Sequence, residues 1–186
     1  SQEILRNHKK QTVEICSGIE ELLEDTRNNP PKESEMMFGP FPSVNKLYGS
    51  LSEPGAITVV GARSGVGKTS MGLFYNVYLA QKNNLDLLWL DSAEMTIKQL
   101  QFRITCGLTG GKVPLWALRE GKWANNEEWV KLVRSATPET KKIKIHYGST
   151  YGLKANDIIK LIRNFSYQIG KEKKFLVCLD YLKAME

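Results

Sequence analysis

Cysteine and histidine are scarce in this sequence of 186 residues, and neither kind is clustered. The three cysteines, Cys16, Cys106 and Cys178, are odd in number, far apart and without a CxxC pair. This spacing argues against a disulfide framework or a zinc cluster and fits a reducing compartment. The two histidines, His8 and His146, have no companions at metal-ligand spacing, so we interpret both as ordinary residues.

Long apolar runs are also missing. No run approaches the length that spans a bilayer, and the opening residues SQEILRNHKK are polar. We therefore expect neither a membrane span nor a secretory signal. The composition, 41% hydrophobic and 25% charged, is ordinary for a globular domain with a sizeable core.

Basic residues exceed acidic ones, 26 to 20, which gives a formal net charge of +6. This excess permits a polyanionic partner without indicating one. The densest basic runs, residues 141–144 and 171–174, each stand just before an apolar run that is typical of a strand. They lack the interleaved aromatic residues that a stacking platform for single-stranded nucleic acid needs, so we interpret them as solvated turns.

The apolar pattern predicts an N-terminal helix followed by an α/β domain. Residues 1–27 place five apolar positions on one helix face, namely Val13, Cys16, Ile19, Leu22 and Leu23. The run NNPPKES at residues 28–34 breaks this pattern, so residues 1–35 are predicted to form a linker helix and a hinge. The apolar face must cover another surface, either of its own domain or of a neighbouring subunit.

Residues 36–186 alternate between strand and helix patterns. Strands are predicted at residues 56–60, 87–90, 143–147 and 175–180. Three helices are predicted. The first follows residues 61–70 and ends at about residue 81, the second begins at about residue 95, and the third covers residues 155–169. Strands that alternate with helices form parallel sheets covered on both faces, so we expect an α/β fold with a mainly parallel sheet flanked by helices.

The segment GARSGVGKTS at residues 61–70 has the pattern of a phosphate-binding P-loop between a strand and a helix. The strict pattern begins with Gly where this chain has Ala62. Small residues let backbone N–H groups turn toward phosphate oxygens, and the next helix adds the positive end of its dipole. We therefore predict an ATP site formed by Ala62, Arg63, Ser64, Gly65, Val66, Gly67, Lys68, Thr69 and Ser70.

Three side chains are predicted to act on the phosphates and on Mg²⁺. Lys68 can reach the β- and γ-phosphates of ATP, and the Thr69 hydroxyl can ligate Mg²⁺. Asp180 ends an apolar strand, as a Walker-B carboxylate does when it holds Mg²⁺. The alternative for Asp180 is a helix N-cap or a strand-end turn, but the presence of a P-loop favours the Mg²⁺ role.

Glu94 follows the second predicted strand, and two roles are open for it. A strand-end acid near a γ-phosphate can orient or deprotonate the attacking water. The spacing of Asp91 and Glu94 also resembles a capping box, in which Glu94 would serve only the start of the next helix. The residues alone leave both roles open.

From about residue 38 onward, the sequence resembles the first part of the RecA-like motor domain of DnaB-type replicative helicases, including their phage relatives. Four segments carry the resemblance in the same order. They are the Ala-started P-loop, SAEM at residues 92–95 with Gln99, Leu100 and Arg103 behind it, REGK at 119–122 with EEW at 127–129, and LDYL at 179–182. Each segment alone is weak evidence for the family, but the four segments in this order are specific for it.

The resemblance implies a P-loop ATPase that hydrolyses ATP with Mg²⁺ to drive a replicative DNA helicase along single-stranded DNA. It implies that Glu94 is the catalytic base, that Lys68 clamps the phosphates, and that Thr69 and Asp180 hold Mg²⁺. It also implies a ring-shaped homohexamer, a primase or loader as a partner, and the cytoplasm of a bacterium or of a phage-infected host cell as the location.

Two other functions stay open at this stage. A RecA- or RadA-type recombination ATPase would use the same fold, although the EMxxxQL segment at residues 94–100 favours the helicase. A nucleotide-binding assembly module that scarcely hydrolyses ATP is the other alternative. Turnover measured with and without single-stranded DNA separates this module from both enzymes.

The sequence also departs from the family pattern. Asp91 and Ala93 stand where the family usually has apolar residues, and His146 with Tyr147 replaces a frequent acidic pair. In RecA-like sheets, the strand after the Walker-B strand usually lies between the two motif strands, and this sequence ends at Glu186. We therefore expect a sheet that is incomplete toward the C-terminus, and only weak ATPase activity from these 186 residues alone.

Overall fold

The computed structural model describes residues 16, 18–30, 32 and 36–180. The chain divides into two compact units, residues 1–36 and residues 37–186. In the first unit, helix α2 (Ile19–Asn28) begins after Gly18, whose φ of 84° is left-handed. The helical pattern predicted for residues 1–27 therefore does not run as one helix through Gly18, which is the left-handed N-cap of α2. Residues 1–15 and 17 of that prediction lie outside the described residues.

Helix α2 exposes its apolar side chains in the described part of the chain. Ile19, Leu22 and Leu23 are all exposed, and no residue of the helix is buried. That this apolar face covers another surface therefore stays a prediction.

The second unit contains a parallel sheet of three strands in the order β2–β1–β3. Strand β1 spans Asp86–Asp91, β2 spans Ile145–Ser149 and β3 spans Phe175–Asp180. Strand β1 is central and almost wholly buried, as a strand with a neighbour on each side should be. The three corresponding predictions are confirmed, although β2 begins two residues later than predicted because residues 141–142 form a turn.

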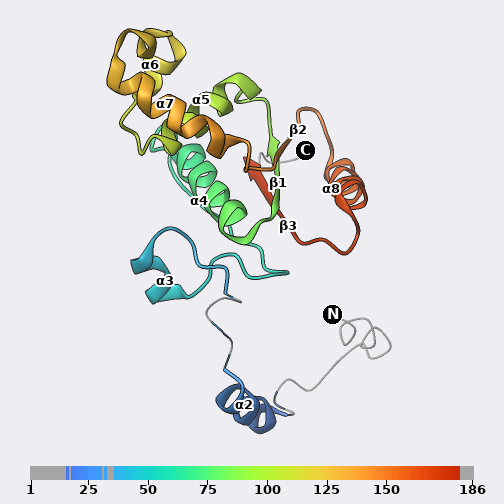
Figure 1. The fold of residues 1–186 in the computed structure, drawn as a ribbon. Coiled ribbons are helices and arrows are strands. Elements are labelled where there is room, and N and C mark those ends of the chain that lie inside the picture. Colours follow the sequence, from blue (N-terminus) through green and yellow to red (C-terminus); the bar gives the residue numbers. More distant parts are fainter. Residues whose placement is uncertain (1–15, 17, 31, 33–35, 181–186) are drawn as a thin grey trace. The chain divides into compact units, whose positions relative to one another are not determined.

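Helices cover both faces of this sheet. Helix α4 (Lys68–Asn83) and helix α8 (Ala155–Ile169) lie on opposite sides of it (Figure 1). Helix α3 (Pro42–Tyr48) precedes the P-loop. Beyond α4, a helical group is formed by α5 (Ile97–Leu108), α6 (Leu115–Arg119), the 3₁₀ helix η3 (Lys122–Asn125) and α7 (Glu127–Thr140). The predicted α/β architecture is confirmed.

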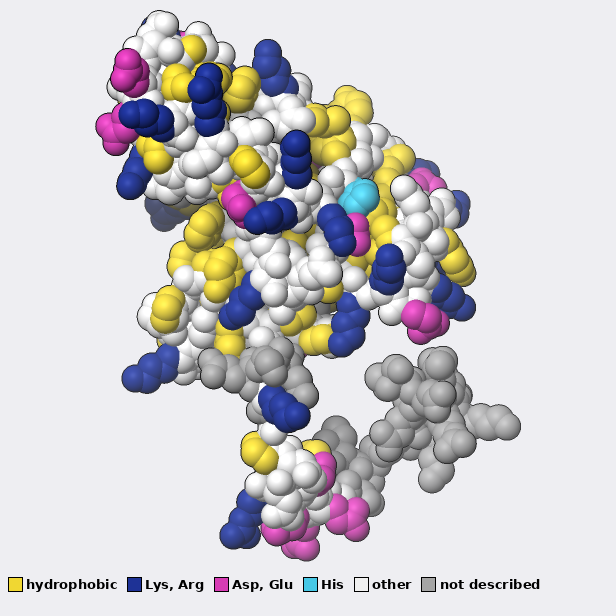
Figure 2. All heavy atoms as spheres, viewed as in Figure 1, with side chains coloured by type: hydrophobic (Ala, Val, Ile, Leu, Met, Phe, Trp, Pro, Cys, Tyr) yellow, Lys and Arg dark blue, Asp and Glu magenta, His cyan; other side chains and the backbone are white. Residues whose placement is uncertain are grey.

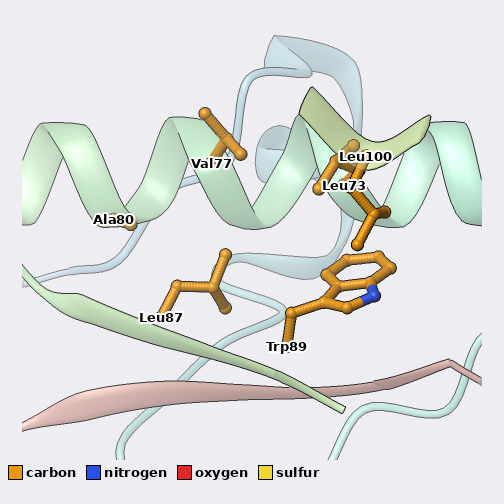
Figure 3. Packing of buried hydrophobic residues seen from close by; sticks show 6 residues of the cluster. All are labelled: Leu73, Val77, Ala80, Leu87, Trp89 and Leu100. Atoms are coloured by element: carbon orange, nitrogen blue, oxygen red, sulfur yellow. The ribbon is translucent and has the colours of Figure 1, made fainter. Parts of the chain in front are cut away.

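The alternation of side chains along β1 creates two apolar clusters. Leu87 and Trp89 point toward α4, and Figure 3 shows the Trp89 ring directed at Leu73, with Leu100 close by. Leu88 and Leu90 pack on the other face against Ile158 and Phe165 of α8. Successive residues of a strand face opposite sides, so one short strand anchors helices on both faces.

Residues 56–60, predicted as a strand, do not form one. Ile57 is 91% exposed and Val59 is 74% exposed. Among the described residues, no strand pairs with this segment, and β3 is an outer strand of the sheet. A β-branched run becomes a strand only where a neighbour takes up its backbone N–H and C=O groups, so local sequence preference alone was not sufficient.

The basic runs are solvated, as predicted. Lys141 and Lys142 lie on an exposed turn, and residues 171–174 are exposed as well. Lys and Arg side chains are spread over the visible face among acidic and uncharged ones (Figure 2). In the part of the chain that the structure describes, no helix is long and apolar enough to cross a membrane.

Candidate active site

The predicted P-loop is an exposed loop that leads directly into helix α4. Gly65 and Gly67 have φ values of 81° and 96°, which a residue with a side chain adopts at a cost. Gly67 is the N-cap of α4, and the half-buried Lys68 and Thr69 open its first turn. The N-cap residue Gly67 makes no side-chain cap bond, and the first N–H groups of a helix typically bind anions such as phosphate.

Arg103 connects helix α5 to the end of the P-loop. Its Nη1 donates a hydrogen bond to Ser70 Oγ over 2.7 Å. The sequence placed Arg103 in a family segment but could not pair it with Ser70, because 33 residues separate the two. This bond links the helix that follows Glu94 to the segment predicted to bind phosphate.

Two buried carboxylates end neighbouring strands at the same edge of the sheet. Asp91 of β1 and Asp180 of β3 are partners in register and are 0% and 5% exposed. Their Oδ2 atoms and Ser92 Oγ are buried without a hydrogen-bond partner in the described structure. Such atoms destabilise a protein unless a donor or a cation reaches them. Mg²⁺ prefers oxygen ligands, so the buried Asp180 carboxylate fits the predicted Mg²⁺ site.

The described residues show no cluster of acidic, His and Cys side chains that would indicate a metal site. They contain no group of three or more His, Cys, Asp or Glu side chains at ligand spacing. In ATPase sites, Mg²⁺ typically takes one or two protein ligands and completes its coordination with water and substrate phosphates. The chain therefore fits an Mg²⁺ site that is shared with a nucleotide, in which Thr69 and Asp180 are the candidate protein ligands.

Glu94 is exposed on a turn between β1 and α5. Helix α5 starts at Ile97, two residues later than predicted, and its capping box consists of Thr96 and Gln99. Glu94 therefore does not cap this helix, and that alternative for it is wrong. Its role as catalytic base stays a prediction.

The Glu94 turn is bonded to both neighbouring strands. Thr150, just after β2, donates its N–H and its hydroxyl to the Asp91 carbonyl over 2.8 and 3.2 Å. Tyr147 of β2 donates its hydroxyl to the Met95 carbonyl over 3.4 Å. On the other side, Ser92 N–H donates to the Asp180 carbonyl over 3.1 Å. The sequence did not predict these bonds, because only the sheet brings Tyr147, Thr150 and Asp180 to the turn.

Two side chains near the buried acids have raised pKa values. Burial, and secondly the charge of Asp91, raise the pKa of Tyr147 above its usual value. Burial, and secondly the charge of Asp180, raise the pKa of Cys178 to about 12. Both groups are therefore neutral at physiological pH, and Cys178 is not a reactive thiolate.

Comparison with known proteins now gives the family. The family model of the DnaB-like helicase C-terminal domain matches residues 40–186. The chain belongs to the DnaB-like helicase C-terminal domain family. Over 180 residues it is also 27% identical to the replicative DNA helicase DnaB of Helicobacter pylori. That alignment covers 94% of this chain but only 35% of the relative.

As a DnaB-like C-terminal domain, the second unit has the RecA-like α/β fold that the resemblance implied. The matched region contains the P-loop, Glu94 and Asp180, whereas helix α2 lies before it. His146 is one of the departures from the family pattern, and it contacts Asp86 and Phe165. Its Nε2 lies 2.8 Å from Asp86 Oδ1, and its ring packs edge-on against Phe165. The interpretation of this histidine as an ordinary residue stays a prediction.

Proposed function

We propose that this chain binds Mg·ATP at residues 62–70 and hydrolyses it as the motor of a replicative DNA helicase. The observation that carries the proposal is the P-loop, which opens helix α4 through the left-handed Gly67 and is followed by Lys68 and Thr69. Helix α4 packs on β1 and β3, the two strands that end in the buried acids. Membership of the DnaB-like family supports the same function.

Each candidate residue has a distinct role in this proposal. Lys68 neutralises charge on the β- and γ-phosphates, while backbone N–H groups of the loop hold the phosphate oxygens. Thr69 and Asp180 hold Mg²⁺, which when bound neutralises charge that develops during transfer. Glu94 orients a water molecule for in-line attack on the γ-phosphorus and accepts its proton. The γ-phosphorus–oxygen bond to ADP breaks, and phosphate leaves.

The proposal extends to assembly and partners. Single-stranded DNA is the proposed track, a homohexameric ring is the proposed active form, and a primase or loader is a proposed partner. These features would belong to the intact protein, because the chain spans only 35% of the length of the H. pylori relative. The same family resemblance supports the bacterial or phage-infected host cytoplasm as the location.

ATP turnover with and without single-stranded DNA tests this function. In the intact protein, we expect Mg²⁺-dependent hydrolysis that single-stranded DNA accelerates, and unwinding of a forked duplex. A protein that binds nucleotide but scarcely hydrolyses it, with or without DNA, would be an assembly module and would refute the motor. Strand exchange without unwinding would instead support a recombination ATPase.

A further inference from the structure

The turn that carries Glu94 begins at a buried aspartate, Asp91, where the family resemblance leads one to expect an apolar residue. We propose that Asp91 is a positioning residue, which holds the Glu94 backbone in place for ATP hydrolysis. The proposal rests on the proposed function of Glu94. It adds a residue to which neither the P-loop pattern nor the Walker-B pattern assigns a role.

Two hydrogen bonds link the Asp91 side chain directly to the turn. Its Oδ1 accepts the N–H of Glu94 over 2.8 Å and the N–H of Met95 over 3.3 Å. A carboxylate that accepts backbone N–H groups forms charge-assisted bonds, which are stronger than neutral ones. An apolar residue at position 91 would leave these two N–H groups without this acceptor.

The backbone between Asp91 and Glu94 is strained. Ala93 has a φ of 69°, in the left-handed region that is unfavourable for a residue with a Cβ atom. Such a conformation persists only where the surroundings fix it on both sides. Backbone bonds to Thr150 and Asp180 fix the start of this turn, and Asp91 Oδ1 fixes its end at Glu94 and Met95.

Burial makes Asp91 rigid and thus suited to this role. Its side chain is 0% exposed, whereas Glu94 is exposed on the same turn. An exposed acid on a loop has many conformations, and a displacement of about 1 Å can reduce catalysis about 10²-fold. The bonds from Asp91 restrict the backbone from which the Glu94 side chain extends.

Amide hydrogen exchange in the intact protein tests the positioning without requiring activity. Asp91→Leu removes the acceptor but suits a buried site, and Asp91→Asn keeps one side-chain oxygen as an acceptor. We expect the amides of Glu94 and Met95 to lose protection in Asp91→Leu and to keep most of it in Asp91→Asn. Unchanged protection in Asp91→Leu would overturn the proposal. If Asp91→Leu does not fold, the same amides in Asp91→Asn still decide, since lost protection in a folded Asn variant would contradict it.

A double-mutant cycle with Glu94→Gln then separates positioning from general stabilisation. We expect Asp91→Leu to lower kcat about 10- to 100-fold with the Kd of a fluorescent ATP analogue nearly unchanged. Asp91→Asn should retain more turnover than Asp91→Leu. In the Glu94→Gln background, Asp91→Leu should have little further effect, because Asp91 acts through Glu94.

The outcomes of this cycle distinguish the two proposals. Additive losses in the double variant, or a loss in Asp91→Asn as large as in Asp91→Leu, would overturn the positioning role while leaving Glu94 as the base. If Glu94→Gln alone kept parental turnover, the catalytic role of Glu94 would be refuted. Asp91 would then have no catalytic side chain to position.

Discussion

The P-loop and the Glu94 turn both lead toward a helix, but they are built in opposite ways. The P-loop is exposed, and its glycines at positions 65 and 67 adopt left-handed backbone at little cost. The Glu94 turn contains the left-handed Ala93 and is held by the buried side chain of Asp91. It is also hydrogen-bonded to both neighbouring strands. The difference reflects their proposed tasks. Backbone N–H groups can bind phosphate from an open loop, whereas a side chain that activates water needs a fixed position.

Removing the P-loop lysine should have the largest effect. In Lys68→Ala, we expect ATP hydrolysis to fall about 10³-fold, the scale of losing a fixed charge at a phosphoryl-transfer site. The fold should persist, because Lys68 is half-buried at the start of α4 and belongs to neither buried apolar cluster. Lys82→Ala, at the exposed far end of the same helix, is the matched control and should behave like the parent. Parental binding and hydrolysis of Mg·ATP by Lys68→Ala would refute the predicted phosphate site.

Glu94→Gln tests the other region. Because glutamine cannot take a proton from water, we expect hydrolysis to fall about 10²-fold or more while ATP binding persists. Binding of a fluorescent ATP analogue and single-turnover hydrolysis measure the two effects separately. Glu128→Gln, on the exposed first turn of α7, is the control. Equal losses of binding in Glu94→Gln and Lys68→Ala would show that the two regions do not divide the work as proposed.

The thiol of Cys178 on β3 should react slowly, mainly because burial raises its pKa. With a pKa of about 12, Cys178 should be alkylated at pH 8 about 10³-fold more slowly than an ordinary free cysteine. Asp180→Asn removes the smaller cause of this shift, so the pKa should fall and alkylation should accelerate, by at most about tenfold. Mass spectrometry after timed alkylation, with the exposed Cys16 as reference, measures both rates. Rapid alkylation of Cys178 in the folded parent would contradict its burial.

The smallest predicted effect concerns backbone strain. Ala93→Gly should raise the free energy of unfolding by about 1 kcal/mol, because glycine adopts left-handed backbone without the Cβ penalty. Asn84→Gly is the matched control, since Asn84 is also left-handed but asparagine tolerates that conformation better. Urea denaturation measures both. A destabilised Ala93→Gly variant would show that the turn does not carry the strain inferred for it.

The sequence predicted local elements well and one strand wrongly. The helix at residues 155–169 and the strand at 175–180 have the predicted bounds, because their apolar periodicity matches the faces they bury. Residues 56–60 are richer in β-branched residues than the strand at 175–180 but remain exposed. The difference is in pairing, since β3 finds β1 as a partner whereas no described strand pairs with residues 56–60.

The sequence by itself determined the features whose residues are neighbours in the chain. The P-loop pattern at residues 62–70 and the helix after it could be predicted directly, because a phosphate site of this kind would depend on neighbouring backbone groups and on one helix terminus. Asp180 and Glu94 could be named as candidates from their places after apolar runs.

Only the tertiary structure decided how these acids are held. The register of β1 with β3 brings Asp91 beside Asp180, and the return of the chain through β2 brings Tyr147 and Thr150 to the Glu94 turn. The Thr96 cap of α5 and the two N–H partners of Asp91 are local, but the sequence did not show that these bonds would form. Hydrogen bonds between residues far apart in the chain depend on strand register and burial, which no local pattern specifies.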